Sequence, residues 1–297
     1  AFIELDSTCP STIKVDEEVA PACVVVVVNQ ESLTLSGEPI GGTGSMNKAG
    51  EGTLTLEGRN TYTGGIVVQD GTLAFTTLLD GGQPSAFGAS DDYAKNWVFA
   101  GGKYLYKGTK TTTNRCARLL KDGELSTTGT AAVLTMNGTF EGSGNFTFSG
   151  RGTLQPNTTH FFGYTGETIL AGGTLHLPNA EIANKGIGSS SKLVFAGGTL
   201  STKGENEGYE NYTFPIEVRE GTTSQFSPRR NCYMKSTVTG AGTLQLNIPY
   251  VRESIQGTWD GFTGRLIGYG TSSGNLFLLS GKNIPNGVVV LKNGARA

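Results

Sequence analysis

Gly52-Thr53-Leu54-Thr55-Leu56 is the stretch that decides the fold class of this 297-residue chain. In an extended strand its side chains alternate, so Leu54 and Leu56 share one face and the two threonines share the other. One such strand cannot bury its leucines alone, but a stack of similar strands joins them into an apolar column. The glycine before the strand permits a positive φ and a sharp turn. We therefore expect stacked short strands with buried leucines and exposed threonines.

The same words recur along the chain at nearly constant offsets. Gly-Thr-Leu returns at Gly152 and again at Gly242, which are 100 and 90 residues after the preceding copies. Leu154 and Leu244 occupy the apolar position of these copies. Val-Phe-Ala-Gly-Gly, which starts at Val98, returns 96 residues later. Gly-Thr-Leu also recurs within this super-repeat in steps of roughly 20 residues, the length of one solenoid coil.

These repeats predict an all-β fold, a right-handed parallel β-helix. A β-sandwich is the alternative, because it also combines short strands with glycine turns. We expect residues 1–43 to form an N-terminal cap or the first coils, with the valine run 24–28 as one buried strand. Residues 44–297 are expected to form the repeat β-helix and to continue beyond this fragment. No stretch shows helical periodicity, and residues 114–120 are expected to form one helical turn at most.

Composition excludes several classes of function. Lys and Arg (23) nearly balance Asp and Glu (25), so a formal charge of −2 predicts no binding to nucleic acid. No apolar run approaches the ~18 residues of a transmembrane helix. The four cysteines and two histidines lack zinc-ligand spacing, so we expect no metal and no cofactor. Cys9 and Cys23 are candidates for a disulfide, with two unpaired thiols as the alternative.

Residues 50–65 read Gly-Glu-Gly-Thr-Leu-Thr-Leu-Glu-Gly-Arg-Asn-Thr-Tyr-Thr-Gly-Gly. This stretch resembles the passenger-associated transport repeat, also called the autotransporter-associated β-strand repeat, in which a Gly-x-Gly-Thr-Leu-x-Leu strand precedes an Asn-Thr-Tyr-Thr-Gly-Gly turn. Asn60, Tyr62, Gly64 and Gly65 are the turn positions of the match. The resemblance implies a β-helical passenger at the outer surface of a bacterium or outside the cell. Such passengers display adhesive or effector regions.

Two groups of side chains are candidates for a ligand surface. Tyr104 and Tyr106 share a strand face and would offer a platform on which sugars stack. Arg229 and Arg230, with Arg219 nearby, form the densest basic spot and would contact a sulfated or carboxylated glycan. The alternative for the arginines is solvated loop charges, whereas Trp97, Phe161, Phe162 and Trp259 are equally well interpreted as core or turn residues.

Three functions remain open from the sequence. The first is a structural or adhesive solenoid that binds host or matrix glycans or proteins, and the second is an inert display stalk. The third is a carbohydrate-active β-helix enzyme, a polysaccharide lyase or glycoside hydrolase, which would need convergent carboxylates. Asp91-Asp92 and Glu17-Glu18 are the candidate pairs, but adjacent strand residues point to opposite faces. We therefore expect no catalytic residues and favour the first function.

Overall fold

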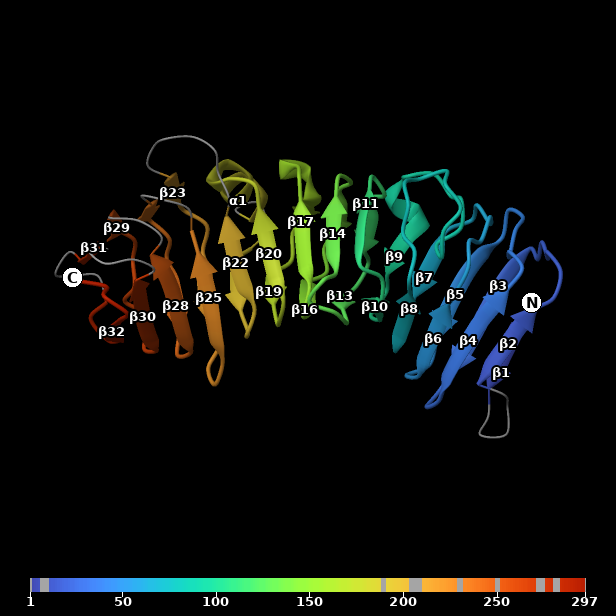
Figure 1. Ribbon diagram of the computed structural model, residues 1–297, viewed down its shortest axis with the longest axis horizontal. Coiled ribbons are helices and arrows are strands. Elements are labelled where there is room, and N and C mark those ends of the chain that lie inside the picture. The colour runs from blue at the N-terminus through green and yellow to red at the C-terminus, as the bar shows by residue number, and fades with distance from the viewer. Residues whose placement is uncertain are drawn as a thin grey trace. The chain divides into compact units, whose positions relative to one another are not determined.

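The computed structural model describes residues 2–5, 11–187, 191–202, 210–228, 232–248, 252–270, 276–279 and 284–296. The chain divides into two compact units, Ala1–Thr153 with His160–Thr165, and Leu154–Thr159 with Gly166–Ala297. In each unit, short strands pair in parallel and stack into sheets (Figure 1). The predicted parallel β-helix is therefore confirmed. A β-sandwich is excluded because its sheets are antiparallel.

The first unit contains three sheets, whose strands are named here in the order in which they pair. The first sheet consists of β1 (Phe2–Leu5), β3 (Cys23–Val28), β5 (Ser45–Ala49), β7 (Ile66–Val68), β9 (Trp97–Phe99), β12 (Ala117–Leu119), β15 (Phe140–Gly142) and β18 (Phe162–Tyr164). The second sheet consists of β2 (Thr12–Val15), β4 (Ser32–Gly37), β6 (Thr53–Leu56), β8 (Thr72–Phe75), β10 (Lys103–Tyr106), β13 (Gly123–Thr127) and β16 (Phe146–Gly150). β11 (Lys110–Thr113) and β14 (Val133–Met136) form the third sheet.

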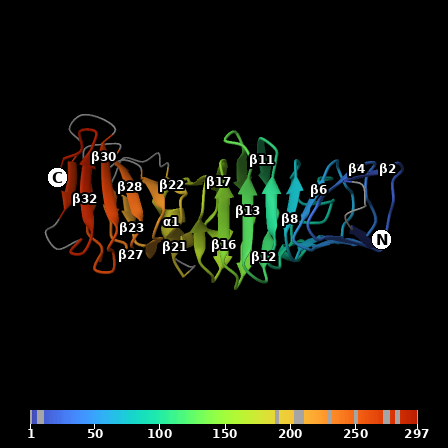
Figure 2. The same cartoon turned by 90° about the horizontal axis from the view of Figure 1, so that it is seen from below.

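The second unit is also built from three sheets. We number them second, third and fourth. The second sheet here consists of β19 (Thr168–Leu170), β21 (Leu193–Phe195), β24 (Ile216–Val218) and β27 (Val238–Gly240). The third sheet consists of β20 (Thr174–Leu177), β22 (Thr199–Thr202), β25 (Thr223–Ser227), β28 (Thr243–Ile248), β30 (Arg265–Gly270) and β32 (Val288–Lys292). The fourth sheet consists of β23 (Glu210–Tyr212), β26 (Cys232–Met234), β29 (Arg252–Ile255) and β31 (Leu276–Leu279). β28, β30 and β32 lie side by side in Figure 2.

The remaining elements are one further strand of the third sheet, two 3₁₀ turns and one α-helix. β17 (Thr153–Pro156) and the 3₁₀ turn η2 (Thr159–Phe161) lie where the chain passes from one unit to the other. A second 3₁₀ turn, η1, spans Ala94–Asn96, and one α-helix, α1, spans Ala180–Gly186. In the part of the chain that the structure describes, no helix has both the length and the hydropathy needed to cross a bilayer.

The core consists of columns of side chains in register. In the second sheet of the first unit, Leu33, Leu54, Leu73, Tyr104 and Leu125 are successive partners, and all five are fully buried. This is the apolar column that the Thr-Leu-Thr-Leu alternation predicts. Each coil buries its apolar face only against its neighbours, so the stack is the unit of stability.

The threonine face is less exposed than expected. Thr53 is half-buried, and Thr55, 8% exposed, is buried beside its strand partners Thr34 and Ala74. Short side chains on a flat sheet cover one another, so outward direction does not ensure exposure. The valine run lies in β3, where three valines are buried and the two between them are half-buried.

One helical expectation was wrong. Residues 114–120, expected to form one helical turn at most, form none, and β12 occupies their centre. Conversely, α1 was not predicted. Its N-cap is Asn179, whose side chain accepts a hydrogen bond from the backbone N–H of Ile182 at 2.9 Å. Seven residues are too few to show a periodic apolar pattern, and only the Pro178-Asn179 pair marks the start of the helix.

One long connection interrupts the rhythm of the first unit. Residues 76–96 join β8 to β9 and contain η1. Arg115, which is only 2% exposed, holds this connection in place through hydrogen bonds from its guanidinium. It donates to the backbone oxygens of Leu79 (2.9 Å) and Gly88 (2.9 Å) and to Ser90 Oγ (2.8 Å). Two longer bonds reach the backbone oxygens of Asp80 (3.4 Å) and Gln83 (3.2 Å).

Candidate functional surface

The turn after β6 explains the residue types of the repeat motif. The Oδ1 atom of Asn60 accepts the backbone N–H of Ile40, one coil earlier, at 3.0 Å. Tyr62 is 2% exposed, and its hydroxyl donates to the backbone oxygen of Ala86 at 3.1 Å. Desolvation raises the pKa of Tyr62 above its usual range, so the phenol stays protonated and can donate this bond. Both side chains therefore attach the turn to its neighbours.

The glycines of the motif act mainly through close packing. A Cβ on Gly64 would lie 2.5 Å from the carbonyl carbon of Gly44 on the preceding coil. Gly65 combines such a contact with a φ of +82°. Gly52, by contrast, is not among the glycines with positive φ, which corrects our expectation. A Cβ there would lie 2.4 Å from the backbone oxygen of Glu31, and the same crowding occurs at Gly152 and Gly242.

The prediction that Tyr104 and Tyr106 form an exposed platform for sugars was wrong. Tyr104 and Tyr106 do share a strand face, but it is the core face, with exposed fractions of 0% and 2%. They pair in register with Leu73 and Phe75, so each occupies an apolar position of the repeat. The hydroxyl of Tyr104 donates to the backbone oxygen of Val98 at 2.8 Å. An alignment of Lys103-Tyr104 after Gly102 with Thr72-Leu73 after Gly71 would have indicated this burial.

The basic spot and the cysteine pair are only partly within the described residues. Arg219 is exposed in the turn after β24, whereas Arg229 and Arg230 lie outside the described residues, so their convergence stays a prediction. Cys9 also lies outside them, and its pairing with Cys23 stays a prediction. Cys23 is half-buried at the start of β3, where the side-chain amide of Asn47 approaches its sulfur at 3.4 Å.

Both candidate acidic pairs lie in connections between strands. Glu17 and Glu18 are both exposed in the connection between β2 and β3. Asp91 accepts hydrogen bonds from the side chain of Asn96 and from the backbone N–H of Tyr93, so it organises its own loop. Among the described residues, no three side chains of His, Cys, Asp or Glu come close enough together to hold a metal ion.

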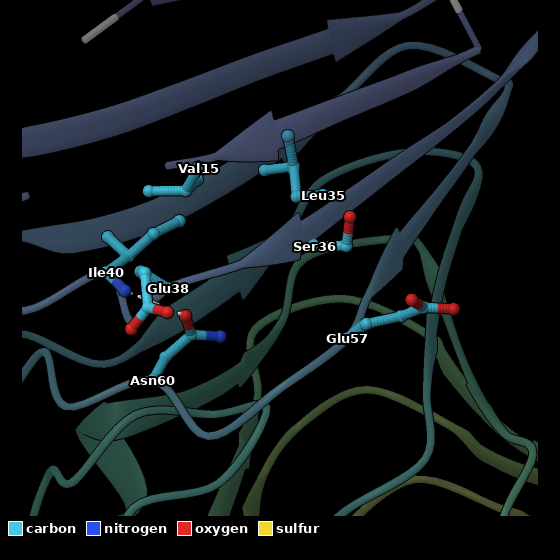
Figure 3. A pocket seen from close by; sticks show the side chains of 7 residues that line it. All are labelled: Val15, Leu35, Ser36, Glu38, Ile40, Glu57 and Asn60. Atoms are coloured by element: carbon cyan, nitrogen blue, oxygen red, sulfur yellow. Dashed lines mark hydrogen bonds between the residues drawn. The ribbon is translucent and has the colours of Figure 1, made fainter. Parts of the chain in front are cut away.

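Among the hollows on the described part of the first unit, one is too narrow for a ligand and another is open to solvent. The first, too narrow to admit a water molecule, lies where the coils of β2, β4 and β6 turn. Figure 3 shows Glu38 and Asn60 side by side in it, with Asn60 bonded to Ile40. The second is an open depression of about 520 Å³ over the turns at Gly101, Leu120 and Gly144, where Leu120 is 58% exposed.

The outer faces of the sheets differ in charge. On the second sheet of the first unit, Lys103 pairs with Glu124 at 2.7 Å. On the second sheet of the second unit, Lys192 lies between Glu167 (3.1 Å) and Glu217 (2.5 Å). These ladders cross from coil to coil and are half-exposed, so each contributes about 1 kcal/mol or less to stability.

The third sheet of the second unit carries a different outer face. We call it the polar strip and define it as six outward side chains of four neighbouring strands: Ser201, Gln225, Ser227, Gln245, Asn247 and Tyr269. Gln225 is exposed and the other five are half-buried. None of the six is charged, but the same outer face also carries the exposed Arg265, strand partner of Thr243, and the exposed Lys292, strand partner of Tyr269. The strands that carry the strip, β22, β25, β28 and β30, lie side by side in Figure 1.

Hydrogen bonds order the polar strip across coils. Gln245 Nε2 donates to Asn247 Oδ1 at 2.8 Å, and Asn247 Nδ2 donates to Ser227 Oγ at 2.7 Å. Next to Ser201, His176 faces outward, with its Nδ1 atom 3.3 Å from Ser201 Oγ. The sequence signal for the strip was the alternation Thr-Leu-Gln-Leu-Asn-Ile at 243–248, but the partner strands could not be aligned without the register.

Comparison with known proteins agrees with this architecture. The family model described as Passenger-associated-transport-repeat matches residues 46–75, which contain β6 and the turn of Asn60 and Tyr62. A protein of Brucella suis biovar 1 (strain 1330) named "Adhesin BmaC autotransporter" is 42% identical over 125 residues. The match covers 41% of this chain but only 4% of that relative's length. No solved structure shows a significant match to the chain. Residues 46–75 of this parallel β-helical chain thus match the passenger-associated transport repeat.

Proposed function

We propose that this chain is a structural and adhesive β-solenoid of a bacterial surface or secreted protein, and that it is not an enzyme. The observation that carries the proposal is the row-like order of the outward polar side chains in the described part of the chain. The described surface offers rows of polar side chains, whereas Glu17 and Glu18 are exposed in a connection and Asp91 and Asp92 bond to Asn96 and Asn114. The similarity to an adhesin autotransporter supports the same function.

An adhesive solenoid works through repetition. Equivalent side chains of successive coils lie about 4.8 Å apart along the sheet, so a face presents the same chemistry many times to an extended ligand. Several weak contacts then act together, and the rigid backbone limits the entropy lost on binding. The proposed ligands are glycans or proteins of a host or matrix.

Adhesion of beads coated with the purified chain to cultured animal cells and to immobilised matrix tests the proposal. Beads that carry the heat-denatured chain provide the control. We expect the native chain to increase bead retention several-fold. Equal retention of both bead types would favour the inert stalk. Release of reducing ends from polysaccharides incubated with the chain would instead support the enzyme.

A further inference from the structure

We infer that one corner of the first unit, where its second sheet turns into its third, binds a sulfated or carboxylated glycan chain. The inference rests on the proposed adhesive function and names a ligand class for it. We call this region the basic corner and define it as residues 107–110, 128–132 and 150–152, at the turns that follow β10, β13 and β16 (Figure 1). Its charged side chains are Lys107, Lys110 and Arg151, and all three are exposed.

The register of the coils places two of these cations in line. The last residues of β10, β13 and β16 are strand partners. The next residue of each coil is Lys107, Thr128 or Arg151, so these three occupy equivalent positions on successive coils. The backbone N–H of Thr128 donates to the oxygen of Tyr106 at 3.1 Å, and that of Arg151 donates to the oxygen of Thr127 at 3.4 Å. With a coil step of about 4.8 Å, the backbones of Lys107 and Arg151 lie about 9.6 Å apart along the stack.

The cations of the basic corner have no carboxylate partner. On the adjoining sheet face Lys103 pairs with Glu124 at 2.7 Å. By contrast, none of the three cations of the corner forms an ion pair with a carboxylate of the described residues. The corner itself contains no Asp or Glu, and the nearest carboxylate in the column of Lys107 is Glu57, two coils earlier. The positive charge is therefore available to an anionic ligand.

The other side chains of the corner favour a glycan over an acidic protein as the ligand. Thr109, Thr128 and Thr130 expose hydroxyls beside the cations, and these can donate to and accept from the hydroxyls of a sugar. The corner has no aromatic and no large apolar residue, whereas protein interfaces are anchored by such side chains. A ligand that binds through hydroxyls and anionic groups needs no apolar anchor, because sulfate and carboxylate oxygens accept charge-assisted hydrogen bonds from lysine and arginine.

The geometry gives the ligand a direction. An extended chain that lies along the column would meet Lys107, Thr128 and Arg151 in turn, on three successive coils. Lys110, the strand partner of Val133, adds a charge at the start of the third sheet. Because these contacts are exposed, each is weak and screened by salt, so the affinity depends on several contacts acting together.

Binding of the full chain to immobilised heparin, dextran and polyglutamate, at low and at high salt, tests the inference. The variant Lys107→Gln/Lys110→Gln/Arg151→Gln removes the charges of the basic corner. The matched control is Arg219→Gln/Arg265→Gln/Lys292→Gln, which removes three exposed charges of the second unit. We expect the corner variant to bind heparin about tenfold more weakly, which corresponds to about 1.4 kcal/mol, and the control to change binding less than about twofold. Added salt should weaken heparin binding, and neutral dextran should not bind.

Thr128→Glu provides a second probe of the basic corner. It places a carboxylate between Lys107 and Arg151 and alters only an exposed side chain. Thr263→Glu, at an exposed position of the second unit, is its control. Thr128→Glu should weaken heparin binding several-fold and Thr263→Glu should not, while circular dichroism establishes that both variants fold.

Three results would each overturn the inference. They are unchanged heparin binding by both corner variants, an equal loss of binding in the two triple variants, and binding to polyglutamate as tight as to heparin. In any of these cases, continued bead adhesion by the native chain would leave the proposed adhesive function intact. Loss of all adhesion by the native chain would remove that function itself.

Discussion

Replacement of Arg115 by methionine should release the long connection 76–96 from the first unit. Methionine keeps much of the aliphatic volume but none of the five hydrogen bonds that the guanidinium makes. The carbonyls of Leu79 and Gly88 and the hydroxyl of Ser90 lose bonds of 2.8–2.9 Å. Desolvation lowers the pKa of Arg115, yet a guanidinium remains protonated in proteins, so the wild-type bonds are charge-assisted.

The expected loss of stability follows from the three short bonds. Hydrogen bonds to charged groups are worth about 1.5–3 kcal/mol each, and an acceptor left unpaired in the interior adds its own desolvation cost. The freed loop regains water for part of its backbone, which offsets some of this cost. We therefore expect Arg115→Met to lower the free energy of unfolding of the first unit by about 3–5 kcal/mol, as for other buried charged networks. The free energy of unfolding of Arg115→Lys should fall between that of the wild type and that of Arg115→Met, because an ammonium has three donors instead of five.

Urea denaturation followed by circular dichroism measures this change, and trypsin cleavage at the exposed Lys95 within the connection reports its local release. Arg118→Gln is the matched control. Arg118 lies three residues away, is 45% exposed and pairs with Glu141 on the surface at 2.6 Å. Its loss should cost less than about 1 kcal/mol. If Arg115→Met were as stable as Arg118→Gln and equally resistant to trypsin, the buried arginine would not fix the connection.

Three further predictions concern the packed coils. Lys48 is buried, and desolvation lowers its pKa to about 8, so the folded state releases this proton before the unfolded state does. The free energy of unfolding of the wild type, relative to that of Lys48→Met, should therefore be constant below pH 8. It should rise from there to about pH 10.4, by at most about 3 kcal/mol. Denaturation at several pH values measures this difference, and a difference that stays constant with pH would contradict the prediction. Gly64→Ala should lower the free energy of unfolding by about 2 kcal/mol or more, because the added Cβ would lie 2.5 Å from backbone atoms. Gly129→Ala, whose Cβ would have 4.0 Å of clearance, should be nearly neutral. Equal melting temperatures of the two variants would refute this prediction. Tyr104→Phe should cost about 1 kcal/mol through the lost bond to the Val98 carbonyl and should leave glycan binding unchanged, which a melt and a binding curve would test together.

The repeat spacing was sufficient to predict the parallel β-helix, because the alternation of residues within one strand shows which side chains must be buried. Leu54 and Leu56 had to share a buried face, and a recurring Gly-Thr-Leu had to stack on itself. The direction of Tyr104 was harder to predict. Its own strand alternates Lys-Tyr-Leu-Tyr, in which either face is apolar enough for a core. Only alignment with the preceding coil assigns it to the interior.

The surface was less predictable than the core for the same reason. The proximity of Gln225, Gln245 and Asn247 depends on the register between strands, because the first lies on β25 whereas the other two lie two residues apart on β28. Single-sequence reasoning finds side chains that share a strand but not side chains that share a column. Arg115 was missed because its acceptors are mostly backbone oxygens of a distant loop, which no residue type signals.

The contacts of the repeat turn reach one coil back, and this has an evolutionary consequence. Asn60 bonds to Ile40, and Gly64 packs against Gly44, each 20 residues earlier. A duplicated coil would therefore bring its own attachment points and meet a compatible partner on the coil before it. Genes of such a design can lengthen or shorten by whole coils through recombination while the remaining protein still folds. Length then becomes a trait that selection can tune separately from the chemistry of any single face.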